Sequence, residues 1–161
     1  MVDHSKKRKK RGFTSKQMGD ACEMLVAAEL TLSGIPSLKV PDNWPGYDVI
    51  AQPMNSPPLR ISVKARTFSE KSDYFVEYNS YDQFDWLAVV FLECPGRRTF
   101  IIPRDLADKQ ARRNNEASKL PHSRYWSQKQ FRELFALYEN NVHLSHPPRT
   151  AAQQSAGAIP E

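Results

Sequence analysis

The sequence predicts an α/β fold in which helices flank a central mixed β-sheet. Three observations favour it: a long helix-period pattern near the N-terminus, a series of short strand-like runs after it, and two further helical patterns toward the C-terminus. With 161 residues, of which 40% are hydrophobic and 25% charged, the chain can bury one core. We expect one domain over 13–145, between a disordered basic arm (1–12) and a disordered tail (146–161) that has few large apolar side chains.

The first element is predicted to be a helix over 15–33. Thr14 or Ser15 can cap its start, and Gly34 can take the left-handed conformation that often ends a helix. Apolar residues recur every three or four positions and indicate one buried face. That face is expected to contain Ala21, Leu25, Ala28 and Leu32, widened by Met18, Cys22 and Val26.

Short runs bounded by Gly and Pro predict the strands of the sheet. They lie at 35–40, 47–51, 59–66, 74–78, 85–92 and 99–102. The run at 85–92 is almost continuously apolar, which is typical of a strand buried on both faces. In 59–66 the residues alternate, so Ile61, Val63 and Ala65 should face a core, and the opposite face should carry Ser62, Lys64 and Arg66.

Two helices are expected near 104–112 and 127–140. Ser127 and Gln130 have the spacing of a capping box, and Trp126 can pack on Phe131 as a hydrophobic staple. This interpretation makes Trp126 a structural residue in preference to a base-stacking one. The buried face of the helix is expected to contain Phe131, Leu134, Phe135 and Tyr138.

The positive charge of the chain is concentrated at its N-terminus. Residues 1–11 carry six basic residues and one acid, a net +5 that equals the formal charge of the whole chain. The basic run is Lys6, Lys7, Arg8, Lys9, Lys10 and Arg11. Such a run attracts phosphate without sequence specificity, because binding releases counterions. It therefore indicates nucleic-acid affinity, with a solvated leader as the alternative.

Composition excludes several other classes of protein. The two cysteines, Cys22 and Cys94, form no CxxC pair and no histidine cluster accompanies them, so a zinc site is not expected and both should be reduced core thiols. No run approaches the ~20 apolar residues of a membrane span, and no apolar segment follows the basic arm. We therefore expect a soluble, cytoplasmic protein that does not bind membranes.

A chemically informative set of residues occurs in the order helix, strand, strand. Hydrolysis of a phosphodiester requires a hard cation held by carboxylates, a water next to it and a positive charge for the phosphate. Glu23, Asp48 and Lys64 can supply the carboxylates and the positive charge. Each has an ordinary structural explanation when taken singly, but their order and spacing together favour a site.

These segments resemble the PD-(D/E)xK nuclease superfamily, in particular the small endonuclease-like members related to archaeal Holliday-junction resolvases. The resemblance is carried by Gly19-Asp20-Ala21-Cys22-Glu23, Gly46-Tyr47-Asp48-Val49-Ile50 and Ile61-Ser62-Val63-Lys64-Ala65-Arg66, and extends more loosely to about residue 110. It implies a restriction-endonuclease-like core, Mg²⁺ or Mn²⁺ as cofactor and DNA as partner. A homodimer is expected from analogy alone.

The resemblance also implies a role for each residue. Asp48 would be the principal metal ligand, Glu23 an additional acid that contacts the metal through water, and the carbonyl of Val63 a third ligand. Lys64 would orient water or stabilise charge. The alternation of the strand, and not the resemblance, makes Arg66 a candidate contact to the nucleic-acid backbone, because it puts Arg66 on the face of Lys64.

Ser62 departs from the pattern of the superfamily, which usually has an acid at this position. Its hydroxyl can accept a hydrogen bond from a metal-bound water, and Asp20, Glu23 or Glu77 could supply the missing carboxylate. Three hypotheses follow: a metal-dependent DNA endonuclease, a nucleic-acid-binding module on a catalytically degenerate nuclease fold, and a scaffold subunit whose nucleic-acid affinity depends on residues 1–11.

Overall fold

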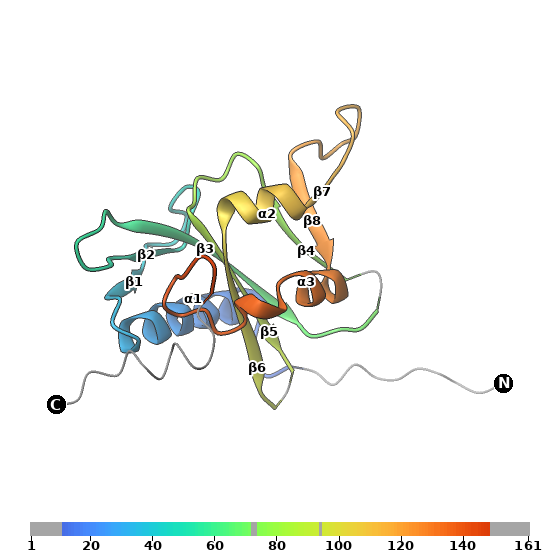
Figure 1. Cartoon of the computed structure of the whole chain (residues 1–161). Helices are drawn as coiled ribbons and strands as arrows, with labels where there is room; N and C mark the ends of the chain where they lie inside the picture. Colours follow the sequence, from blue (N-terminus) through green and yellow to red (C-terminus); the bar gives the residue numbers. More distant parts are fainter. Residues whose placement is uncertain (1–10, 72–73, 94, 149–161) are drawn as a thin grey trace.

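The computed structural model describes residues 11–71, 74–93 and 95–148 (Figure 1). Its main element is a five-stranded sheet of order β1-β2-β3-β5-β6. The strands are β1 (Ser37–Lys39), β2 (Val49–Ala51), β3 (Leu59–Thr67), β5 (Trp86–Leu92) and β6 (Arg97–Pro103). β3 and β5 are parallel and every other neighbouring pair is antiparallel, so the sheet is mixed, as predicted.

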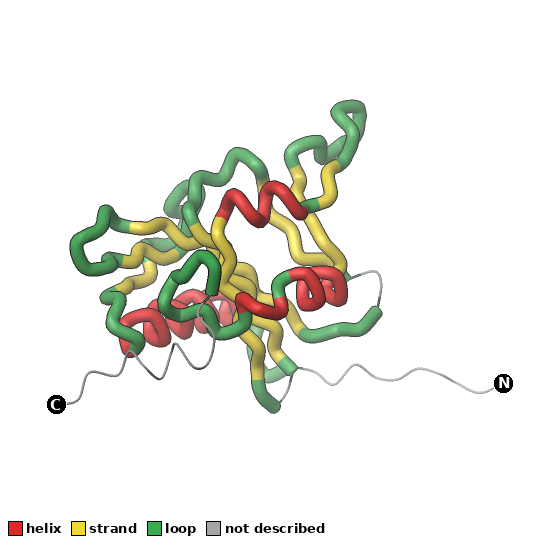
Figure 2. The backbone as a smooth tube through the Cα atoms, viewed as in Figure 1, coloured by secondary structure: helices red, strands yellow, loops and turns green. Residues whose placement is uncertain are grey.

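Helices cover both faces of this sheet (Figures 1 and 2). Helix α1 (Ser15–Leu32) packs on one face. The other face carries α2 (Arg104–Gln110), α3 (Gln128–Leu134), the 3-10 helix η1 (Ala136–Tyr138) and a three-stranded sheet of order β4-β8-β7. The smaller sheet consists of β4 (Phe75–Asn79), β7 (Arg112–Arg113) and β8 (Ser123–Ser127). The predicted α/β class with a flanked mixed sheet is confirmed.

The two faces of the sheet bury separate cores because side chains alternate along each strand. On β3, Ile61 and Val63 belong to the core beneath α1. Leu87 and Val89 of β5 belong to the other core, and the register between the two strands sets them beside Ser62 and Lys64. The alternation predicted for β3 is therefore correct.

Helix α1 begins and ends where the sequence predicts. Thr14 accepts a hydrogen bond from the Gln17 N–H at 3.1 Å, and Gly34 follows the helix with φ +100°. The predicted buried face was partly wrong, because Ala21 and Ala28 are exposed and Leu32 is 89% exposed, whereas Leu25 packs against the core. The main core contacts come from Met18, Cys22 and Val26, which the prediction included as a margin, and from Leu30, which it did not name.

The smaller sheet was not fully predicted. β4 lies within one residue of its predicted position, whereas β7 and β8 were absent from the prediction. Arg112, expected at the end of a helix, lies in β7. β8 pairs along its whole length with β4, from which more than 40 residues separate it. Local patterns carry no signal for such a pairing, which a distant strand stabilises.

The C-terminal helical segment is shorter than predicted. The hydroxyl of Ser127 accepts a hydrogen bond from the Gln130 N–H at 3.2 Å and caps α3, and the rings of Trp126 and Phe131 meet at 5.3 Å. Trp126 is 1% exposed, which confirms its structural role. The helix ends at Leu134, which is 50% exposed, and was wrongly assigned to the core.

Among the described residues, no helix is both long and apolar enough to span a membrane.

We predict that Phe131→Ala lowers the free energy of unfolding by roughly 3–5 kcal/mol, because the fully buried ring leaves a cavity among four other aromatic rings. Urea unfolding followed by circular dichroism measures the change. The control is Leu137→Ala, since Leu137 is 83% exposed and its loss should change stability by no more than about 0.5 kcal/mol. Equal effects of the two substitutions would contradict the assignment of this core.

Candidate active site

Asp48 lies at the entry to β2, directly after a turn that requires glycine. Gly46 has φ +89°, and a Cβ at this position would lie 2.9 Å from the backbone nitrogen of Gln83. The turn therefore has a fixed shape. The Asp48 N–H donates to the Ile61 carbonyl at 2.9 Å, and its carboxylate accepts a hydrogen bond from the Val63 N–H at 2.7 Å. Asp48 is thus held against the middle of β3.

The same hydrogen bond orients Val63. In a β-strand the N–H and the C=O of one residue point to the same side, as in the residue pairs of an antiparallel ladder that exchange both bonds. Because the Val63 N–H points toward Asp48, the Val63 carbonyl points to that side of β3 as well. A carboxylate and a backbone carbonyl, both hard oxygen donors, therefore share this edge.

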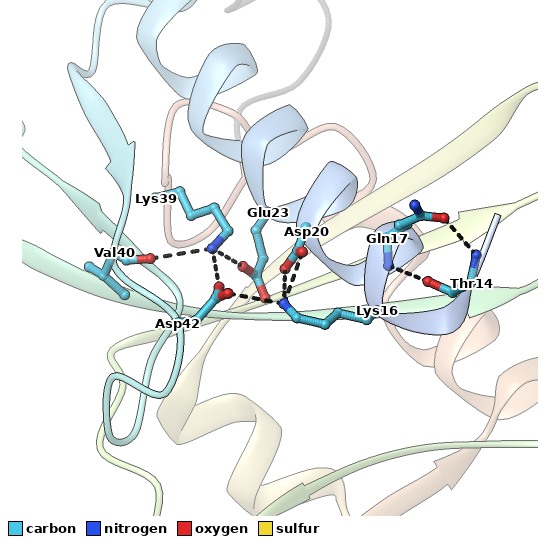
Figure 3. A network of polar contacts seen from close by, with 8 residues as sticks. All are labelled: Thr14, Lys16, Gln17, Asp20, Glu23, Lys39, Val40 and Asp42. Carbon is cyan, nitrogen blue, oxygen red and sulfur yellow. Dashed lines mark hydrogen bonds and ion pairs between the residues drawn. The ribbon is translucent and has the colours of Figure 1, made fainter.

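Glu23 reaches the same region from α1. Glu23 and Asp48 both line a cavity of about 240 Å³. The Glu23 carboxylate lies 3.2 Å from the Lys39 ammonium, and both side chains are about one-fifth exposed (Figure 3). Burial raises the pKa of Glu23, the nearby charge of Asp48 raises it further, and the hydrogen bond from Lys39 opposes the rise.

Three charged residues of this cavity were missed by the sequence analysis: Lys16, Lys39 and Asp42. Lys39 also binds Asp42 at 2.9 Å, and Lys16 bridges Asp20 and Asp42 at 3.0 Å each (Figure 3). These hydrogen bonds hold the pKa of Asp42 below its ordinary value. The i,i+4 spacing of Lys16 and Asp20 was a detectable signal, whereas no local pattern relates Lys39 to Glu23.

Lys64 lies apart from the acidic cavity. It lines two other cavities of about 410 Å³ each, and Arg66 lines both with it. Arg66 donates to the Phe75 carbonyl at 3.1 Å and to the Ala65 carbonyl at 2.8 Å, and burial lowers its pKa. The structure thus brings Lys64 and Arg66 together as expected, and connects Lys64 to Asp48 through the intervening residue Val63.

Ser62 is 2% exposed, so its hydroxyl lies inside the protein. Of the acids considered as substitutes for the missing carboxylate, Asp20 and Glu23 line the cavity of Asp48. Glu77 lines a cavity with Lys64 and Arg66. Within residues 11–71, 74–93 and 95–148, no group of three or more His, Cys, Asp or Glu is arranged to hold a metal ion.

Arg11, the last residue of the basic run, lies beside Lys64. Arg11 donates to the Thr67 hydroxyl at 3.0 Å and lines one cavity with Lys64 and Arg66. The other members of the basic run, Lys6–Lys10, lie outside the described residues.

No family model matches the sequence, and no curated protein matches it significantly. Its structure is similar to that of a bacterial homing endonuclease, I-Ssp6803I, with TM-score 0.50 and 17% identity over 77% of this chain and 95% of that chain. It is also similar to Hjc, a Holliday junction resolvase from the archaeal hyperthermophile Archaeoglobus fulgidus, with TM-score 0.42 and 13% identity over 65% of this chain and 86% of that chain. The chain has a nuclease-like fold of the restriction-endonuclease type.

We predict that Lys39→Met raises the pKa of Glu23 further, because it removes the cation that opposes the effects of burial and of Asp48. The carboxyl ¹³C shift of Glu23, followed by NMR through a pH titration, measures the change. Lys129→Met on α3 serves as the control, since Lys129 is exposed and does not line this cavity. An unchanged or lower pKa in Lys39→Met would contradict the ion pair.

Proposed function

We propose that the protein is a divalent-metal-dependent endonuclease of the PD-(D/E)xK type that hydrolyses phosphodiester bonds in DNA. The observation that carries this proposal is the hydrogen bond from the Val63 N–H to the Asp48 carboxylate. This hydrogen bond joins the start of β2, next to Asp48, to the middle of β3, where Lys64 is the residue after Val63. The nuclease-like fold supports the proposal, while the chemistry is inferred from the residues.

The donor set fits a hard divalent cation. Asp48 and Glu23 line one cavity, and the Val63 carbonyl points to the side of Asp48. Mg²⁺ is commonly bound by one or two carboxylates together with waters and substrate phosphate, so two acids suffice in the absence of a third at Ser62. Asp48, Glu23 and Val63 would hold Mg²⁺ or Mn²⁺. Such a cation supplies an activated water and neutralises charge on the phosphate.

The cationic residues have a different task from the acids. Lys64 would stabilise the negative charge that develops on the phosphate, as a preorganised positive group does in a water-poor site. Arg66 and Arg11 line a cavity with Lys64 and would hold the strand by its phosphates. The basic run ends at Arg11, so residues 6–10 would extend this contact without sequence preference.

We predict that the wild-type protein cleaves DNA with Mg²⁺ or Mn²⁺, and that Asp48→Asn and Lys64→Ala each lower the rate by roughly 10²- to 10³-fold. Labelled single strands, duplexes and four-way junctions on denaturing gels measure cleavage. Asp48→Asn is chosen because an amide can still accept the hydrogen bond from Val63. Lys109→Ala is the control for Lys64→Ala, since Lys109 is an exposed residue of α2.

Ser62 favours a second function, a nucleic-acid-binding module on a nuclease fold that lacks catalysis. Under this alternative DNA stays intact with either metal, and salt-sensitive binding survives the substitution of Asp48. If the DNA stays intact and the gel shift is retained, the endonuclease hypothesis is rejected in favour of the binding module. Loss of all DNA affinity on deletion of residues 1–11 would exclude a binding role for the folded domain.

Melting temperatures can test, without an activity assay, whether a carboxylate at position 62 would strengthen metal binding. We predict that Ser62→Asp lowers the melting temperature of the metal-free protein, because a carboxylate at a position only 2% exposed pays a desolvation cost. Mn²⁺ should then raise the melting temperature of Ser62→Asp more than that of the wild type, because tighter binding to the folded state stabilises it more. Ser62→Asn is the uncharged control. Equal Mn²⁺ shifts in all three proteins would show that position 62 does not contact the metal, and the absence of any shift would argue against a metal site at this edge.

A further inference from the structure

A groove of about 410 Å³ lies beside Lys64, away from the acidic cavity of Asp48. Each of three segments contributes to its lining. Lys64 and Arg66 come from β3, Glu77 and Asn79 from β4, and Lys119 and His122 from the connection between β7 and β8. That connection projects from the body of the molecule at the upper right of Figure 1. The groove beside Lys64 is thus formed by β3 together with the smaller sheet.

The groove carries both signs of charge. Lys64, Arg66 and Lys119 are cationic, whereas Glu77 and Asp82 are carboxylates in the same lining. A site that binds only a phosphate backbone needs cations alone, and carboxylates there would repel it. The edge of a nucleobase, in contrast, presents donors and acceptors side by side, and a carboxylate can accept from an exocyclic amine. The lining therefore suits a phosphate together with its base.

The volume of the groove limits what can enter. Cavities of ~300–1,000 Å³ hold one drug-sized molecule, which is comparable in size to a single nucleotide. A paired base presents its Watson–Crick edge to the partner strand, so side chains of the groove can reach that edge only when the base is unpaired.

An exposed aromatic pair stands next to this lining. The ring of Tyr81, which is 70% exposed, lies 4.2 Å from the ring of His122, and its hydroxyl is 3.1 Å from Nε2 of that histidine. The Tyr81 N–H donates to the side chain of Asn79 at 2.9 Å, which fixes the turn. Tyr81 is therefore held in place with most of its surface open to solvent. Such a ring can stack on any base, since every base has a π-face.

We propose, building on the nuclease function proposed above, that this groove binds an unpaired nucleotide of a DNA strand. Lys64 and Arg66 contact its phosphate, Glu77 and Asn79 face the edge of its base, and Tyr81 with His122 stacks on the neighbouring base. The preferred substrate is then DNA with a single-stranded segment at the site, such as a frayed end, a flap or a junction.

The test is fluorescence anisotropy of the full-length protein in EDTA at one fixed salt concentration. The probes are a short labelled single strand of mixed sequence and its blunt duplex. We expect the wild type to bind the single strand more tightly. Tyr81→Ala should weaken single-strand binding roughly 5- to 150-fold, which corresponds to the stacking of one base, and should leave the duplex affinity unchanged.

Tyr81→Phe keeps the ring and removes the hydroxyl that contacts His122, so it should restore most of the single-strand affinity that Tyr81→Ala loses. His122→Ala tests the same stack from its other member and should weaken single-strand binding. The proposed binding of an unpaired nucleotide would be contradicted if Tyr81→Ala bound the single strand as tightly as the wild type does. An equal loss of affinity for the single strand and for the duplex would contradict it as well. If cleavage persists in that case, the nuclease proposal stands without the groove. A wild-type protein that neither binds nor cleaves DNA overturns both.

Discussion

The register between the parallel strands β3 and β5 is the constraint on which the remaining structure depends. It is locked at one end by Arg60 and Asp85, since the Asp85 carboxylate accepts from the Arg60 N–H at 2.8 Å and from its guanidinium at 3.2 Å. The Asp85 N–H returns a bond to the Arg60 carbonyl. A slip of one residue would exchange the two faces of β3 and bury Lys64 under α1.

The candidate residues are divided between two cavities beside β3. Acids from α1 and from the turn before β2 line one cavity, and Arg11, Lys64 and Arg66 line another together with the first residues of α1. Only a short piece of backbone separates Asp48 from Lys64, because Asp48 is bonded to Val63 and Lys64 comes next. A phosphate that touches both cavities would therefore lie across the edge of a strand whose position the core already fixes.

Much of this arrangement is local in origin and so could be predicted. The alternation of β3 and the capping of α1 depend on neighbouring residues, and both appeared as expected. The buried face of α1 could not be identified, because two adjacent stripes of the helix are apolar and only the sheet selects between them. Lys39 and the strand β8 were missed for the same reason, since their partners, Glu23 and β4, lie far away in the sequence.

The ion pairs around Glu23 have a consequence for the order of binding. The lining of that cavity holds four carboxylates and two ammonium groups, a formal charge of 2 − 4 = −2, which one divalent ion cancels. In the proposed nuclease, an approaching polyanion would be repelled by this lining until the ion has bound. Each of the two ligands would then favour binding of the other, and by linkage the coupling free energy is the same whichever binds first. The DNA strand would therefore bind next to this cavity only after a divalent cation has neutralised the negative charge of its lining.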